Sequence, residues 1–173
     1  MRRSLIGIST LALGLVLATA PARAQQVFVA GGVTLPSGDF GDGFKTGWVA
    51  NAGVSFWASA NGRAKLWAEG LYGQNKVDAT VDTDLKATLM GGFGSITYNL
   101  TGGSSTVPYL IGTVGYLREK ISAGGDSESK GGLGFGGGAG LSFGKPYIEA
   151  RYLTASIGGG TTSFIMAVVG VTF

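Results

Sequence analysis

The feature that most constrains the fold is an alternation of apolar with small or polar residues that repeats along the chain. In its clearest instance five residues share one face of an extended segment: Trp48, Ala50, Ala52, Val54 and Phe56. A period of two is typical of a β-strand, whereas a helix repeats apolar residues every three or four positions. The pattern predicts an all-β chain with eight strands, at about 26–35, 47–58, 64–75, 84–100, 107–118, 132–143, 147–156 and 162–173.

The last predicted strand is apolar on one face up to the terminal aromatic residue, Phe173. An exposed apolar edge strand invites pairing with other chains. In a closed barrel the last strand instead pairs with the first, and its apolar face contacts lipid. We therefore expect an eight-stranded antiparallel up-and-down transmembrane β-barrel that this strand closes.

Aromatic residues recur near the ends of the predicted strands. Trp48 and Phe56 are eight positions apart, as are Phe135 and Phe143, and Phe173 ends the last strand. Eight residues of strand cover roughly 26 Å, or about 20 Å of height at a tilt of about 40°. This height approximates the apolar band of a membrane barrel, so these five residues are the predicted aromatic girdle.

The predicted connections alternate in length. Those after the second, fourth and sixth strands are short, and those after the first, third and fifth are longer, whereas 157–161 is a short exception. Short periplasmic turns and longer outer loops are expected of an outer-membrane barrel. Binding residues concentrate on loops above a rigid scaffold. The longest predicted loop, 119–131, and the loop at 36–46 are therefore the candidates for surface contacts.

Residues 1–24 differ from the rest of the chain. A basic start, an apolar run at 5–20 and the small residues of Ala22-Arg23-Ala24 predict a secretory signal peptide, followed by the barrel domain at 25–173. The apolar run is shorter than the roughly 20 residues of a spanning helix. Cleavage would remove three of the 13 basic residues and leave ten, which match the ten acidic residues. A neutral chain without a basic cluster gives no support to a nucleic-acid partner.

Together these features resemble the small eight-stranded outer-membrane barrels of the OmpA/OmpX type, also grouped as outer-membrane β-barrel or porin-like domains. The resemblance covers 25–173 and includes the closing Val169-Gly170-Val171-Thr172-Phe173. It implies a monomer in the outer membrane of a Gram-negative-type bacterial envelope, in contact with outer-membrane lipid. In that family the barrel-assembly machinery reads the C-terminal aromatic strand, so Phe173 is the expected assembly signal.

Four charged residues are predicted to face the lumen. If Leu66 and Ala68 face lipid, the strand alternation turns Glu69 inward, and the same reasoning turns Glu149 and Arg151 inward, with Arg118 joining them. Charges inside a membrane element must pair or be solvated. The network is either a gate on a narrow ion path or a plug of salt bridges. An eight-stranded interior is just wide enough for side chains to fill, which favours the plug. The phase of the strands at 84–100 and 107–118 stays open, because both faces carry apolar residues.

Residue types exclude several kinds of chemistry. The chain has no cysteine and no histidine, and the known outer-membrane barrel enzymes rely on an active-site histidine, so we expect neither an enzyme nor a cofactor. The glycine run at 132–140 loosely resembles a dinucleotide motif but has no following helix. The acidic segment at 76–84 lacks the glycine and the closing glutamate of an EF-hand, so no metal site is predicted.

Three functions remain open. The favoured one is a non-catalytic barrel with a structural role in envelope integrity or a surface-interaction role through its outer loops. The second is a narrow channel for ions or small hydrophobic solutes. The third is a soluble periplasmic β-barrel that binds lipid inside.

Overall fold

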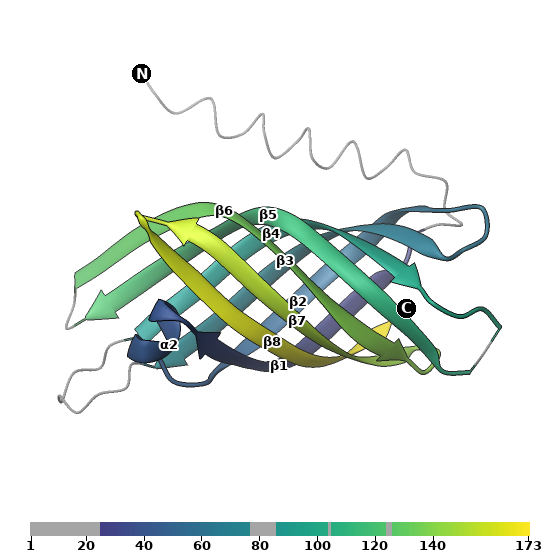
Figure 1. The fold of residues 1–173 in the computed structure, drawn as a ribbon, viewed down its shortest axis with the longest axis horizontal. Coiled ribbons are helices and arrows are strands. Elements are labelled where there is room, and N and C mark those ends of the chain that lie inside the picture. Colours follow the sequence, from purple (N-terminus) through teal and green to yellow (C-terminus); the bar gives the residue numbers. More distant parts are fainter. Residues whose placement is uncertain (1–24, 77–85, 104, 124–125) are drawn as a thin grey trace, which may run out of the picture.

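The computed structural model describes residues 25–76, 86–103, 105–123 and 126–173, and within these ranges eight antiparallel strands close into a barrel (Figure 1). Each strand pairs with the next, and the last pairs with the first through contacts such as Val29 with Val171. The predicted all-β architecture and the closing role of the last strand are therefore confirmed. The strands are β1 (Val27–Ser37), β2 (Gly47–Ala58), β3 (Ala64–Lys76), β4 (Lys86–Asn99), β5 (Val107–Ala123), β6 (Asp126–Ser142), β7 (Pro146–Ile157) and β8 (Gly160–Thr172).

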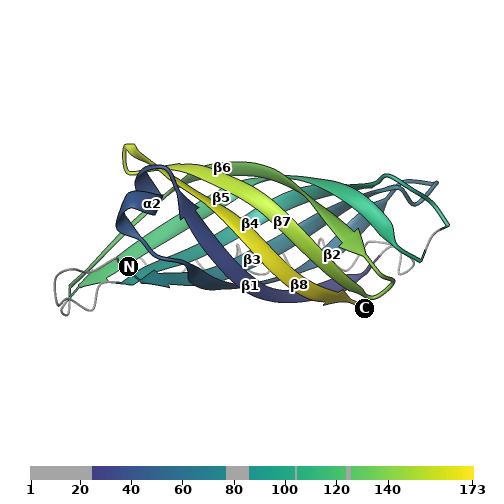
Figure 2. The same ribbon diagram turned by 60° about the horizontal axis from the view of Figure 1, so that its bottom comes forward.

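The barrel is elongated, and its strands are steeply tilted (Figures 1 and 2). One end carries the C-terminus and the connections β2–β3, β4–β5 and β6–β7, and we call it the turn end. The opposite end carries the β5–β6 hairpin and a short helix, α2 (Asp39–Gly43), and we call it the loop end. The predicted signal peptide at 1–24 and nearly all of the acidic segment at 76–84 lie outside the described residues.

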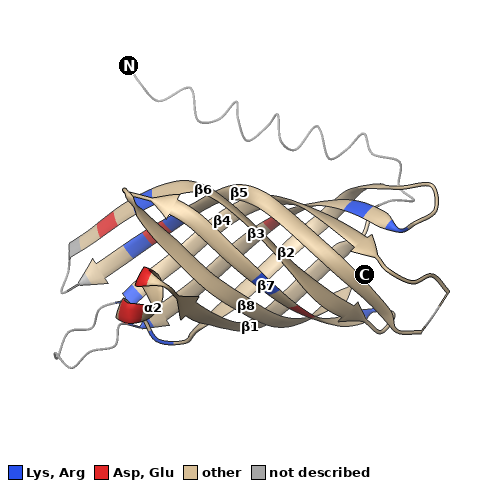
Figure 3. Cartoon of the chain, in the orientation of Figure 1, with Lys and Arg blue, Asp and Glu red and all other residues tan. Residues whose placement is uncertain are grey.

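The outer wall of the barrel is apolar. Large apolar side chains from every strand are exposed on it, among them Leu133, which is 74% exposed, and Val114, Phe135 and Val169. Charged residues gather toward the two ends (Figure 3). A continuous apolar band of this kind is the lipid-facing surface of a transmembrane barrel. Among the described residues, no helix is long and apolar enough to cross a bilayer.

The longest predicted loop is mostly a hairpin. β5 runs to Ala123 and β6 begins at Asp126, and the backbones pair across the segment predicted as loop, for example Glu119 with Lys130. The polar composition of 119–131 is typical of a loop. In an antiparallel pair, however, the backbone hydrogen bonds continue beyond the apolar band, where polar side chains are solvated on both faces. The prediction of a long third loop is therefore wrong.

A β-bulge interrupts β2 near the turn end. Ser55 pairs with Trp67 and Trp57 pairs with Leu66, so that Phe56 is the extra residue. A bulge breaks the strict alternation of side chains between the two faces. Phe56 and Trp57 consequently both face outward, although a regular strand would place Trp57 inside.

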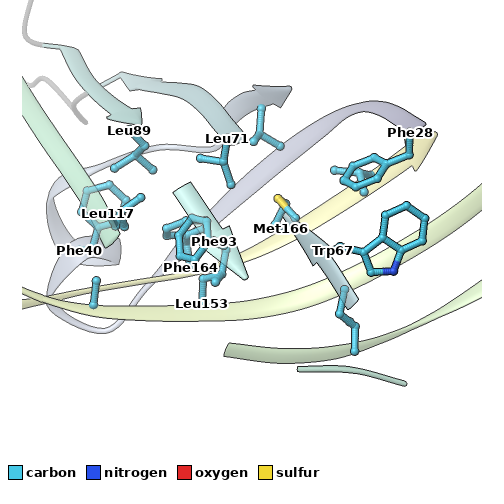
Figure 4. Close-up of a cluster of buried hydrophobic side chains, with 14 of the residues drawn as sticks. Phe28, Phe40, Trp67, Leu71, Leu89, Phe93, Leu117, Leu153, Phe164 and Met166 are labelled. Atoms are coloured by element: carbon cyan, nitrogen blue, oxygen red, sulfur yellow. The ribbon is translucent and has the colours of Figure 1, made fainter. Parts of the chain in front are cut away.

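Apolar side chains fill the loop-end half of the lumen (Figure 4). Phe164 of β8 is completely buried, and its ring lies 6.5 Å from that of Phe40 of α2. The Phe40 ring in turn stacks on Phe44 at 4.5 Å. Phe40 therefore attaches α2 to the buried core at the loop end. We call the following buried residues of this half of the lumen the apolar plug: Phe40, Leu89, Leu117, Leu153 and Phe164.

Candidate functional site

Three buried charged side chains meet inside the barrel. Arg151 of β7 lies between Glu69 of β3 and Glu149 of β7, and their side chains are only 3–4% exposed. Arg151 donates from Nη1 to Glu69 Oε1, and its Nη2 and Nε lie 2.6 and 3.0 Å from Glu149 Oε1. The guanidinium thus joins β3 to β7 across the lumen. Away from its two ends, the barrel has few charged segments (Figure 3).

Hydroxyl groups from two further strands complete the hydrogen bonding of the carboxylates. Tyr109 of β5 donates to Glu149 Oε2 at 2.9 Å, and Ser95 of β4 donates to Glu69 Oε1. The Ser95 and Thr113 hydroxyls lie 2.7 Å apart. Since Ser95 has one proton and gives it to Glu69, Thr113 supplies the proton between these two hydroxyls. We call the whole set the lumen cluster: Glu69, Ser95, Tyr109, Thr113, Glu149 and Arg151.

Inward-facing glycines make room for the large members of the cluster. Gly140 of β6 pairs with Tyr109 on one side and with Glu149 on the other. A Cβ atom at Gly140 would overlap the Tyr109 ring. At Gly138, which pairs with Arg151, a Cβ atom would overlap the neighbouring backbone. The glycine run of β6 therefore packs the lumen, as expected of glycine where side chains or backbone approach closely.

A small cavity opens at the turn end of the lumen. Its volume is about 150 Å³, and Phe28, Trp67 and Tyr147 form part of its wall. Glu69 and Glu149 line it on the side of the lumen cluster. Beyond the cluster, toward the loop end, the apolar plug fills the interior. In the described part of the chain, buried polar side chains and then buried apolar side chains therefore follow one another along the lumen.

The structure brings Glu69, Glu149 and Arg151 together but places Arg118 elsewhere. Arg118 faces outward from β5, and its Nε lies 2.5 Å from Ser129 Oγ. Its neighbours on the chain, Leu117 and Glu119, are the ones that face inward. The prediction that Arg118 belongs to the network is therefore wrong. A strand with apolar residues on both faces gives no clear phase, and here the phase differs from the expected one by a single residue.

Glu119 is the inward charge of β5 that the sequence analysis missed. It is 9% exposed, and its Oε2 accepts a hydrogen bond of 2.8 Å from Thr162 of β8. This bond lies on the loop-end side of the apolar plug. The sequence did contain a signal for an inward charge in β5, whose phase is ambiguous. Arg118 and Glu119 are adjacent, and one of two adjacent strand residues must face inward.

The five residues of the predicted girdle all lie on the outer wall, and each is between 42% and 66% exposed. Phe56, Phe143 and Phe173 are near the turn end, and Trp48 is near the loop end. Phe135 stands in the middle of β6 rather than near its end, because β6 continues to Asp126. Phe173 follows β8 directly, and its N–H lies 2.8 Å from the carbonyl oxygen of Val27. A girdle role for these residues remains a prediction.

Titratable side chains do not gather into a metal site in the described residues, where no group of three or more Asp, Glu, His or Cys is placed to hold an ion. In the lumen cluster each carboxylate already accepts hydrogen bonds from Arg151 and from a hydroxyl. The arrangement therefore cross-links strands, and its donors and acceptors are used within the protein.

Comparison with known proteins identifies the fold. No protein-family model matches the sequence, and no curated protein matches it. Neisserial surface protein A matches the structure with a TM-score of 0.60 and 19% identity, over 86% of this chain and 97% of that one. Ail, the attachment invasion locus protein of Yersinia pestis, in complex with the heparin analogue sucrose octasulfate, matches with a TM-score of 0.56 and 13% identity, over 87% and 99%. The chain therefore has the fold of the small eight-stranded outer-membrane β-barrels of the OmpA/OmpX type.

Proposed function

We propose that the chain is a non-catalytic barrel of the bacterial outer membrane, closed to ions and solutes, which supports the envelope and presents its loop end as a contact surface. The observation that carries this proposal is the position of Arg151, which joins Glu69 to Glu149 across the lumen with the apolar plug behind it. An eight-stranded barrel is just wide enough for side chains to fill. The lumen contents therefore hold the barrel wall together.

The channel and soluble-carrier alternatives have less support. A channel needs a water-filled path, but the turn-end cavity of about 150 Å³ leads to the lumen cluster and then to buried apolar side chains. A soluble lipid carrier needs an apolar cavity and a polar outer wall. Here the turn-end cavity is lined in part by carboxylates, and the outer wall is apolar.

The orientation follows from the connections. Short turns of outer-membrane barrels face the periplasm and longer connections face outward, so the loop end would be extracellular. It presents exposed charges on α2 and on the β5–β6 hairpin, where Lys130 pairs with Glu128 at 2.9 Å. Ail has been solved in complex with a heparin analogue. This complex supports the proposal that a barrel of this fold serves as a scaffold for contacts with other molecules.

The purified barrel is expected to produce no reproducible conductance steps in planar lipid bilayers, because the lumen cluster and the plug obstruct the lumen. An open porin in the same bilayers serves as the control for insertion. Steps that increase with the amount of protein, and whose size changes in an Arg151→Lys variant, would show a path through this lumen and contradict the proposal.

Deletion of Phe173 is expected to reduce the amount of barrel assembled in the membrane more than it reduces the stability of the folded barrel. Phe173 is 66% exposed, and it contributes a backbone pair with Val27 at the barrel seam. The measurements are the heat-modifiable fraction in membranes and the urea midpoint of the refolded protein. The control is Phe143→Ala, which removes another exposed aromatic at the turn end. Equal membrane yields for the deletion and the full chain would refute a signal role for Phe173.

A further inference from the structure

The turn-end cavity has a polar mouth and carboxylates at its inner end. Partly exposed residues lie at the mouth, among them Gln26, Lys65 and Thr172. Glu69 and Glu149 of the lumen cluster, which are 8% and 7% exposed, line the inner end. A protein cavity of about this volume can hold a molecule of the size of benzene. A compact group of a few non-hydrogen atoms therefore fits inside, and the rest of a longer ligand would lie at the mouth.

Three aromatic rings from separate strands form walls of the cavity. Phe28 of β1 lies edge to face with Trp67 of β3, with ring centroids 5.5 Å apart and ring planes at 74° (Figure 4). Phe28 also lies edge to face with Tyr147 of β7, at 6.2 Å and 82°. Trp67 Nε1 donates a hydrogen bond of 3.0 Å to Thr97 Oγ1, which fixes the indole. Aromatic rings arranged around a cavity in this way recognise quaternary ammonium groups.

The inner end of the cavity attracts a cation but offers it few hydrogen-bond acceptors. Glu69 and Glu149 supply two carboxylates and Arg151 one guanidinium, so the lumen cluster itself has one negative charge in excess. Their side chains are 3–4% exposed, so water screens this charge weakly. Arg151, Ser95 and Tyr109 already donate hydrogen bonds to the carboxylates. A fully alkylated ammonium suits this site, because it binds through its charge and the aromatic faces and has no N–H to satisfy.

A cationic side chain lies at the other end of the cavity. Lys65, Trp67 and Glu69 follow one another on the inward face of β3, at intervals of about 7 Å. Lys65 Nζ lies 2.6 Å from Gln26 Oε1, and an ammonium group has two further protons to donate. From the mouth inward, the cavity therefore presents an ammonium, an aromatic wall and a carboxylate. A molecule with an anion at one end and a cation at the other has the complementary arrangement.

We propose that the turn-end cavity binds a small zwitterion that has an alkylated ammonium group and a carboxylate. The ammonium lies among the rings of Phe28, Trp67 and Tyr147, and the carboxylate accepts a hydrogen bond from Lys65 at the mouth. γ-Trimethylaminobutyrate represents this class, because its chain lets the ammonium enter while the carboxylate stays outside. The site goes beyond the proposed function, since it requires neither a passage through the lumen nor contacts at the loop end.

Isothermal titration calorimetry of the folded barrel with γ-trimethylaminobutyrate, in maltoside micelles, tests the site. Detergents with a quaternary ammonium head group are avoided, because they would compete for the cavity. Saturable binding is expected. The isosteric tert-butyl carboxylate, in which carbon replaces the ammonium nitrogen, is expected to bind about tenfold more weakly, because the attraction between the cation and the rings is lost.

Replacing Lys65 with methionine is expected to change the binding of two ligands in opposite directions. γ-Trimethylaminobutyrate should bind about tenfold more weakly, since a charge-assisted hydrogen bond is lost. Tetramethylammonium, which has no carboxylate, should bind more tightly than to the wild type, because the repelling cation at the mouth is gone. Lys145→Met is the matched control, since Lys145 is an exposed cation of the turn end outside the cavity lining. It is expected to bind both ligands like the wild type.

Trp67→Leu is expected to weaken the binding of γ-trimethylaminobutyrate about tenfold, because the indole wall is lost. The matched control is Trp57→Leu, which removes an indole from the outer wall, where Trp57 is 45% exposed. Heat-modifiable gel mobility verifies that each variant is folded. If Trp67→Leu does not fold, the opposite shifts in Lys65→Met still decide the proposal.

Three results would overturn the zwitterion site: no saturable binding by the wild type, equal binding of the tert-butyl isostere, or equal effects of Lys65→Met and Lys145→Met. Equal binding of the isostere would indicate a site for apolar molecules. These outcomes are distinguishable from failure of the proposed function, because conductance is measured on the wild-type barrel without the ligand.

Discussion

Replacing Arg151 with alanine is expected to lower the free energy of unfolding of the barrel by about 3–5 kcal/mol, because removal of one partner of a buried ion pair leaves an uncompensated buried charge. Arg151 is 3% exposed and is the cation that contacts both Glu69 and Glu149. Without it, two carboxylates would remain in the lumen with only hydroxyl donors. Equilibrium urea unfolding of the barrel in lipid vesicles, followed by tryptophan fluorescence, measures the change.

Two further variants separate the loss of pairing from the loss of a side chain. Arg118→Ala, on the outer wall, is expected to change the unfolding midpoint little. Adding Glu69→Gln and Glu149→Gln to Arg151→Ala is expected to restore part of the stability, since no charge is then left unpaired. An unchanged midpoint in Arg151→Ala alone would show that the lumen cluster does not stabilise the barrel.

The inward charges of β3 and β7 were predictable because each strand has one unmistakable lipid face. Ile148 and Tyr152 flank the inward positions of β7, and a one-residue shift would have put Arg151 into lipid. In β5 the two possible phases would place residues of nearly equal hydrophobicity on the lipid-facing side, since Leu117 and Tyr116 suit either face. The phase of β5 follows from its register with β4 and β6, which a single strand does not contain.

The hydroxyl members of the lumen cluster lay beyond sequence reasoning for a related reason. Ser95 and Thr113 are on different strands and meet because β4 and β5 pair with these two residues opposite each other. Their distance from Glu69 depends on the register of β3 with β4, where Glu69 pairs with Phe93. Alternation indicates which way a side chain points, but only the register between strands determines its neighbours.

The bulge in β2 and the long β5–β6 hairpin show two further limits. The pair Phe56-Trp57 offers two large aromatics in succession, which indicates an irregularity without locating it. The hairpin beyond Glu119 is mostly polar because it extends past the apolar band, and Ile121 is its one large apolar residue, so the alternation that identifies strands is too short to be recognised there. Strand detection by hydrophobicity therefore reports the part of each strand that contacts lipid and core, and misses the part that is solvated.

Phe164→Ala is expected to destabilise the barrel by about 3–5 kcal/mol, the range for truncating a buried phenylalanine to leave a cavity. Phe164 is completely buried in the apolar plug, where its ring contacts that of Phe40 of α2. The control is the next residue, Ile165→Ala, because Ile165 is 41% exposed on the lipid-facing side of the same strand. Lipid or detergent can fill the space that Ile165 vacates, whereas the closed interior cannot be refilled in this way.

Urea unfolding of the two variants in the same vesicles makes the comparison direct, since both remove apolar side-chain atoms from neighbouring positions of β8. The Phe164→Ala variant is expected to unfold at a clearly lower urea concentration than the Ile165→Ala variant. It is also expected to expose α2 to protease, because Phe40 loses the ring that it contacts under the helix. A larger loss in Ile165→Ala would mean that β8 has the opposite phase, with Ile165 inside, and would contradict both the plug and the closed lumen that depends on it.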